Sequence, residues 1–116
     1  MSDHPNTDRA EQLAALLTDA GIRATADLRS AVPPCVLVEP LPRLTFNQTL
    51  GGAPAAVWQI IALAPAPGTL TAAKTLDALA ADVATVLDLD DATPGVYQTA
   101  LSADPLPAYV LTYTEP

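Results

Sequence analysis

Charge is missing from long parts of this chain. No Asp, Glu, Lys or Arg occurs in Leu44–Ala73, and Asp104 is the only charged residue in Ala92–Thr114. The charges gather instead in Asp8–Arg29 and Lys74–Asp91. Since a strand with one wet face alternates apolar and polar residues, segments this poor in charge predict strands that are buried on both faces.

Basic and metal-binding residues are scarce as well. Five Lys and Arg stand against thirteen Asp and Glu, which gives a formal net charge of −8. Such a surface repels phosphate, so it argues against a protein that neutralises a nucleic-acid backbone, although plain solubility also explains it. The single Cys35 and single His4 exclude an intrachain disulfide, a zinc site and a plausible histidine-based triad.

Motifs for other chemistry are also missing. The glycines form no phosphate-binding pattern, and Asp88, Asp90 and Asp91 lack the glycine and closing glutamate of an EF-hand loop. The apolar runs fall short of the roughly 20 residues of a membrane span, and no basic patch precedes an apolar run at the start. We therefore expect a soluble protein made in a reducing cytoplasm, without enzymatic activity, metal or cofactor.

Two helices are predicted by apolar residues at helical spacing. Asp8 and Glu11 fit a capping box, which predicts a first helix over residues 8–20 and a disordered tail over residues 1–7. A second helix of about 17 residues begins with Thr69 or Thr71 as its cap. Its apolar stripe is formed by Leu76, Leu79, Ala80, Val83, Val86 and Leu87.

Runs of apolar and β-branched residues predict the strands. The central one is Ala55–Ala64, with Trp58 and Ile60 on one face and Ile61 and Leu63 on the other. This order of elements predicts one α+β domain over residues 8–116, with two helices on one face of a mostly antiparallel sheet. The remaining predicted strands are Ile22–Asp27, Cys35–Glu39, Arg43–Phe46, Val96–Leu101 and Ala108–Thr114.

The central strand is apolar on both faces, which predicts a partner. Helices of the same chain can cover one face, and a second copy is the simplest cover for part of the other. Trp58 is either a core residue or an interface anchor, since tryptophan is enriched at binding hot spots. The loop Asn47–Pro54 reads as a glycine-rich arm that docks on a neighbour. The interface residues predicted on this basis are Phe46, Asn47, Leu50, Trp58, Ile60, Tyr97 and Tyr109.

From about Ala10 onward the chain resembles the tail terminator proteins of long-tailed phages, especially those that infect actinobacteria. The most specific segments are Ala20–Thr25 (AGIRAT), Pro33–Val38 (PPCVLV) and Leu106–Tyr109 (LPAY). The tryptophan strand AVWQIIALAPAPG and the helix LDALAADVATVL add to the resemblance.

The resemblance implies a small α+β subunit, six copies of which form a ring. Such a ring caps the tail tube, ends its polymerisation, meets the head-side connector protein and lets DNA pass through without specific binding. The family contributes no active site, and its place is the tail–head junction of the virion. Two alternatives stay open: another neck component, such as a head-completion or connector ring, and a small enzyme or ligand-binding domain with a pocket under the proline-rich loops.

Overall fold

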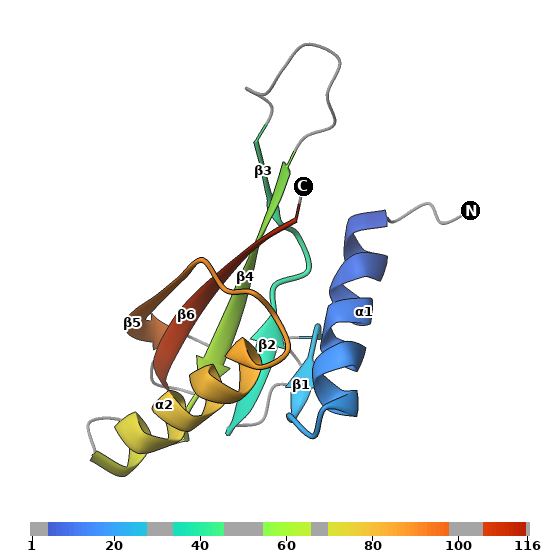
Figure 1. The fold of residues 1–116 in the computed structure, drawn as a ribbon. Coiled ribbons are helices and arrows are strands. Elements are labelled where there is room, and N and C mark those ends of the chain that lie inside the picture. Colours follow the sequence, from blue (N-terminus) through green and yellow to red (C-terminus); the bar gives the residue numbers. More distant parts are fainter. Residues whose placement is uncertain (1–4, 28–33, 46–54, 66–69, 98–105, 116) are drawn as a thin grey trace.

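The fold is organised around the strand β4 (Ala55–Leu63), which lies in the middle of one sheet (Figure 1). The computed structural model describes residues 5–27, 34–45, 55–65, 70–97 and 106–115. The predicted α+β class, with two helices on one face of a mostly antiparallel sheet, is confirmed. The other elements are α1 (Pro5–Asp19), β1 (Ala24–Thr25), β2 (Cys35–Val38), β3 (Arg43–Thr45), α2 (Leu70–Ala84), β5 (Asp91–Tyr97) and β6 (Leu106–Glu115).

The strand order β1-β2-β4-β6-β5 brings together segments that are far apart in the sequence. β1 runs parallel to β2, and the other pairings among the described strands are antiparallel. β2 pairs with β4 only from Ile60 onward, whereas β3 pairs with Ala55, Ala56 and Val57. β3 and the start of β4 therefore form an antiparallel pair, and β6 runs along the other side of β4 as far as Ala56 (Figure 1).

The register assigns the side chains of β4 to two faces, as the sequence predicts. Trp58 and Ile60 pair with Tyr113 and Leu111 of β6, and cross-strand partners lie on the same side of a sheet. This side, which α1 and α2 cover, is called the helix face. The opposite side, which carries Ile61 and the other alternate residues of β4, is called the far face.

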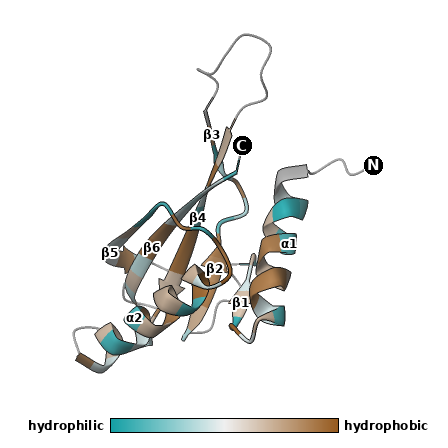
Figure 2. Cartoon of the chain, viewed as in Figure 1, coloured by the Kyte–Doolittle hydropathy of each residue, from teal (hydrophilic) through white to brown (hydrophobic). Residues whose placement is uncertain are grey.

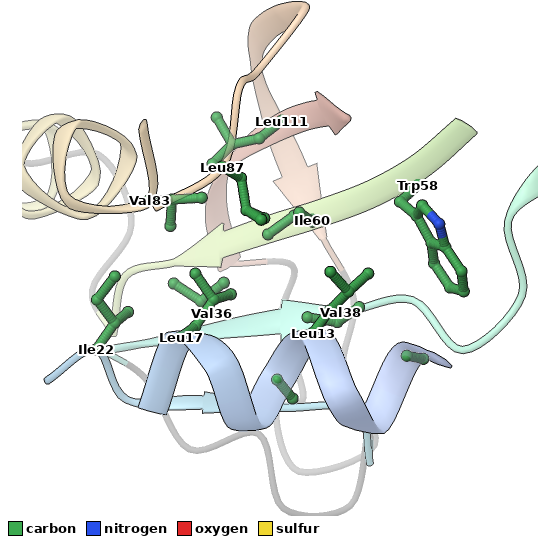
Figure 3. Packing of buried hydrophobic residues seen from close by; sticks show 12 residues of the cluster. Leu13, Leu17, Ile22, Val36, Val38, Trp58, Ile60, Val83, Leu87 and Leu111 are labelled. Atoms are coloured by element: carbon green, nitrogen blue, oxygen red, sulfur yellow. The ribbon is translucent and has the colours of Figure 1, made fainter. Parts of the chain in front are cut away.

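The helix face holds the larger core. Leu13 and Leu17 of α1 are one helical turn apart and form one apolar stripe, and Val83 of α2 points at the same sheet (Figure 3). Figure 2 shows hydrophobic residues along β4 and on α1. Each large aliphatic side chain buried here stabilises the fold by about 1.5–3 kcal/mol. The cluster comprises Ala10, Leu13, Ala14, Leu17, Ile22, Val36, Val38, Trp58, Ile60, Val83, Leu87 and Leu111.

The helix α1 begins three residues earlier than predicted. Pro5 occupies its first position, where proline's fixed φ suits a helix and its missing N–H is not needed. Asp8 lies in the first turn, where the helix dipole favours a carboxylate. Residues 5–7 are therefore helical and not part of a disordered tail, while residues 1–4 lie outside the described residues. The second helix also differs from its prediction: α2 ends at Ala84, before the predicted end near Asp88.

The strand β5 also differs from its prediction. It covers Asp91–Tyr97, whereas Val96–Leu101 was the predicted range. Pro94 fits within this strand because β5 is at the edge of the sheet and needs hydrogen bonds on one side only. β6 begins at Leu106, two residues before the predicted start.

The far face is buried by the chain itself. Cys35, Leu37, Ile61, Leu63 and Ala108 form a second cluster in which no residue is more than 1% exposed. Among the described elements both helices contact the sheet from the other side. The expectation that a second copy must cover the central strand is therefore wrong for the residues of this cluster.

The twist of the sheet supplies part of this cover. Tyr97 at the end of β5 packs against the far-face cluster and donates a 2.9 Å hydrogen bond to Glu39, which follows β2. β4 and β6 lie between β5 and β2, so a flat sheet would separate the two residues by at least about 14 Å. The side chains meet because a twisted sheet brings diagonally opposite corners toward one face.

Leu63→Ala tests the burial of the far face. We expect the substitution to lower the free energy of unfolding by about 2–5 kcal/mol, since it leaves a cavity in a packed core. Gln59→Ala, an exposed position on the same face of the same strand, is the matched control and should change stability by less than about 0.5 kcal/mol. Urea unfolding of dilute protein measures both. If Leu63→Ala lowered the free energy of unfolding as little as Gln59→Ala does, the burial of Leu63 within one chain would be contradicted.

Candidate interaction surface

Two of the predicted interface residues lie in the core of the chain. Trp58 and Ile60 are 1% and 0% exposed, and both belong to the helix-face cluster. The prediction that they contact another subunit is therefore wrong, because almost none of either residue reaches the surface. The alternative interpretation of Trp58, a core residue, is the one that the structure supports.

The other predicted interface residues are divided between the two faces and the undescribed loop. Tyr109 is half-buried against the helix-face cores, and Tyr97 is half-buried on the far face. Phe46, Asn47 and Leu50 lie outside the described residues. The structure thus does not bring the predicted set together on one surface.

A polar cluster explains how the only tryptophan can be buried. The indole N–H of Trp58 donates a 2.9 Å hydrogen bond to the carboxylate of Glu115, and the Tyr113 hydroxyl lies 3.4 Å from the other carboxylate oxygen. Arg9 of α1 donates to the same carboxylate, its Nε at 3.0 Å, and forms an ion pair with it. Since a buried N–H without an acceptor costs about 1–3 kcal/mol, Glu115 makes the burial of Trp58 possible.

The charges of Arg9 and Glu115 stabilise each other. Hydrogen bonds from Arg9 lower the pKa of Glu115, although partial burial opposes the shift. Glu115 in turn raises the pKa of Arg9 through the same hydrogen bonds. The pair joins the beginning of α1 to the end of β6, which are 106 residues apart in the sequence.

Glu115→Gln removes the charge and keeps the shape. We expect the free energy of unfolding to fall by about 1–2 kcal/mol near pH 7, a moderate value because the Arg9 side chain stays 40% exposed to screening water. The folded pKa of Glu115 lies below its unfolded value, so its contribution is present above about pH 4.5 and is lost as pH falls through the folded pKa.

Denaturant unfolding at pH 7 and pH 3 measures this contribution. The difference between wild type and Glu115→Gln should be smaller at pH 3 than at pH 7. A difference of the same size at both pH values would show that the charge of Glu115 does not stabilise the fold.

Tyr97 is the second tyrosine with a specific partner. Burial raises its pKa from 10.0 to about 12, and the hydrogen bond to Glu39 adds to the shift. The neutral hydroxyl is thus favoured in the folded chain. Its contribution to stability is complete below pH 10 and is lost as pH rises from about 10 towards 12.

Tyr97→Phe should lower the free energy of unfolding by about 1 kcal/mol at pH 7, because it deletes one hydrogen bond to a charged acceptor. It should also remove part of the loss of stability that the wild type shows above pH 10. Tyr109→Phe, which keeps the Tyr97–Glu39 contact, is the control. A Tyr97→Phe variant with the alkaline stability profile of the wild type would contradict the role of this contact.

The exposed part of the molecule includes the hairpin of β3 and β4. Leu44 in β3 is 37% exposed, and Leu41 just before β3 is 69% exposed. Arg43 is exposed between them and forms no ion pair with any residue that the structure describes. β3 therefore exposes Arg43 and part of Leu44, and their side chains lie on opposite faces because neighbours along a strand alternate.

A groove of about 670 Å³ lies between α1 and the edge strand β1. The carboxylates of Glu11, Asp19 and Asp27 border it, and the described residues that line it include no cation. Its walls are otherwise formed by small residues and one proline, namely Thr7, Ala14, Ala15, Thr18, Ala24, Thr25, Ala26 and Pro40.

Reactive groups do not converge on this groove. Cys35 is buried on the far face, and burial raises the pKa of its thiol, which disfavours the nucleophilic thiolate. In the described part of the chain, no three His, Cys, Asp or Glu residues are grouped to hold a metal ion. Within the same residues, no helix combines the length and apolar character needed to cross a bilayer.

The comparisons with known proteins identified no relative of this chain. No family model, curated protein or solved structure matches the chain. The resemblance to tail terminators thus rests on the sequence segments named above.

Sequence reasoning missed both the groove and the Glu115 cluster. The groove arises where α1 meets β1, and a two-residue strand has no distinctive pattern. Glu115 had one available signal: a charged residue at the end of a charge-poor strand needs a partner. Nothing in the sequence indicated that Arg9 would be that partner.

Proposed function

We propose that the chain is the structural subunit of a phage tail terminator ring. In this proposal six copies, the number that the resemblance implies, form a ring that caps the tail tube, ends its polymerisation and joins the tail to the head-side connector protein. The protein acts at the tail–head junction and carries out no catalysis. The sequence resemblance from about Ala10 onward and the fold class that it implies support the proposal.

The observation that carries the proposal is the resemblance of Ala20–Thr25, Pro33–Val38 and Leu106–Tyr109 to tail terminator proteins. The sheet itself is buried within one chain, so it no longer argues for a partner. Leu41, just before β3, and Leu44, in β3, are nevertheless exposed. The two leucines are three residues apart in the sequence, and exposed apolar residues that are grouped are typical of a surface that contacts a neighbouring subunit.

The acidic composition is compatible with a DNA channel. A ring of six chains would carry six times the formal charge of −8. Repulsion between this charge and phosphate would keep DNA from adhering to a lumen that carries these acids. The same repulsion acts between subunits, so their contacts must place opposite charges or apolar surface together.

The alternatives differ from the proposal in position and chemistry. Another neck ring would have the same kind of subunit but would not contact the last ring of tube protein. A ligand-binding domain would need a concave site with convergent polar groups and apolar walls. The groove beside α1 is lined mainly by alanine, threonine and carboxylate side chains, which gives a small ligand few apolar contacts.

Electron microscopy of particles from the genome that encodes the chain tests the proposal. We expect the chain between the last tube ring and the head-side connector. Leu44→Asp should give a folded subunit that no longer caps tails, so that tails become overlong and headless. Leu70→Asp, at a 72% exposed leucine of α2, is the matched control and should cap normally. Absence of the chain from purified particles would reject the proposal.

A further inference from the structure

We propose that the groove between α1 and β1 binds an extended, basic segment of a different protein, which adds to the open edge of β1 as a further strand. Cations on one side of that segment meet Glu11 and Asp19 of α1. This inference goes beyond the proposed function, since it holds whether or not the chain forms a ring. The shape of the groove, the open strand edge and the charges beside it support the inference independently.

The groove has the form of a site for strand addition. α1 and β1 lie side by side (Figure 1), and the Thr18 hydroxyl of α1 is 3.3 Å from the Ala24 carbonyl oxygen of β1. The groove measures about 670 Å³, which is within the roughly 300–1,000 Å³ of ligand sites. Its small lining residues leave the backbone of β1 within reach of a ligand, and they include Ala14, Ala15, Ala24 and Ala26.

The edge of β1 has backbone groups that a further strand can pair with. β1 ends the sheet, and the Arg23 carbonyl accepts a 2.8 Å hydrogen bond from the Val36 N–H of β2. Since the backbone groups of successive strand residues point to opposite sides, the N–H and C=O of Ala24 point away from β2. Among the described residues the Ala24 N–H has no partner.

The Ala24 carbonyl is also available to a ligand. The Thr18 hydroxyl near it has one proton, and its shorter contact, 2.9 Å, is with the Ala14 carbonyl oxygen. A segment that adds to such an edge gains main-chain hydrogen bonds, while its side chains set the specificity. This kind of binding suits a groove that offers few apolar contacts.

The helix side of the groove presents negative charge that the described chain does not neutralise. Glu11 and Asp19 are exposed on α1, eight residues or about 12 Å apart along the helix. Neither forms an ion pair or a side-chain hydrogen bond with any described residue. A strand rises by about 3.3 Å per residue, so cations about four positions apart lie on one side of it at the matching distance.

The sequence excludes a second copy as the source of this segment. No two of its five Lys and Arg residues are four positions apart, and Asp27 lies between the nearest two, Arg23 and Arg29. Copies of net charge −8 also repel each other. Charge complementarity therefore favours a basic segment of a different protein as the occupant.

An NMR titration of the isotopically labelled full chain with designed peptides tests the contact. The probe is the acetylated and amidated peptide TKVAVKT, whose lysines lie on one side of a strand at the spacing derived above. The peptide TKVAKVT has the same composition, but its lysines lie on opposite sides of a strand. A version of TKVAVKT with methylated backbone amides keeps the charges and cannot pair with a strand edge.

Variants of the chain test the groove side of the contact. Glu11→Gln with Asp19→Asn removes the charges and keeps the size of the side chains. The matched control, Asp77→Asn with Asp82→Asn, makes the same change in net charge at exposed positions of α2 outside the groove. Circular dichroism verifies that both variants fold.

We expect TKVAVKT to shift the amide signals of α1 and β1 and to bind at least about tenfold more tightly than TKVAKVT, since only TKVAVKT places both cations against the helix. The groove variant should bind TKVAVKT about tenfold more weakly than wild type, and the control variant should bind it like wild type. Methylation of the peptide backbone should abolish binding, and salt should weaken it.

Several results would overturn the inference. No binding of TKVAVKT at about 1 mM, equal affinities for the two lysine peptides, or a groove variant that binds like wild type would each do so. Equal affinities would mean that cations are attracted to the acidic chain without a specific site. If the chain self-associates without peptide and the same signals of α1 and β1 shift, a second copy occupies the groove and the inference is wrong.

Discussion

The fold depends on burying a strand that is apolar on both sides within one short chain. α1 and α2 cover the helix face of β4, where their apolar stripes meet Trp58 and Ile60. The far face has no described helix over it, yet Ile61 and Leu63 are fully buried there. Sheet twist brings Tyr97 across to Glu39 and closes part of that face. The strand that suggested a partner is thus satisfied internally.

Polar contacts then fix the ends of this arrangement. Glu115 gathers Trp58, Tyr113 and Arg9, so one carboxylate ties α1 to the two central strands. The Tyr97–Glu39 contact ties the edge strand β5 to the chain after β2. Except for Tyr113, two residues from Glu115, the partners in these contacts are more than fifty positions apart. Because they form only in the folded chain, they favour one arrangement of the sheet and helices over loosely packed alternatives.

Local patterns in the sequence were sufficient for the fold class and for the faces of β4. Apolar residues at helical spacing identified the two helices, and the alternation of side chains along a strand assigned the residues of β4 to its two faces. The limits of α1 and β5 were predicted less well, since Pro5 and Pro94 are breakers in general but are tolerated at a helix start and in an edge strand. The interface could not be predicted from apolarity, because the pattern of a strand is the same whether its own chain or a neighbour covers it.

The residues that the core leaves exposed are therefore a better guide to partners than the apolar pattern of a strand. Leu44 of β3 is 37% exposed, Arg43 beside it is exposed on the opposite face of the strand, and the carboxylates beside α1 line a wall without described cations. In the proposed ring, contacts between copies of net charge −8 must bring opposite charges or apolar surface together. A contact between unlike patches also has a direction, and a direction is what lets identical subunits close into a ring instead of stopping at a pair.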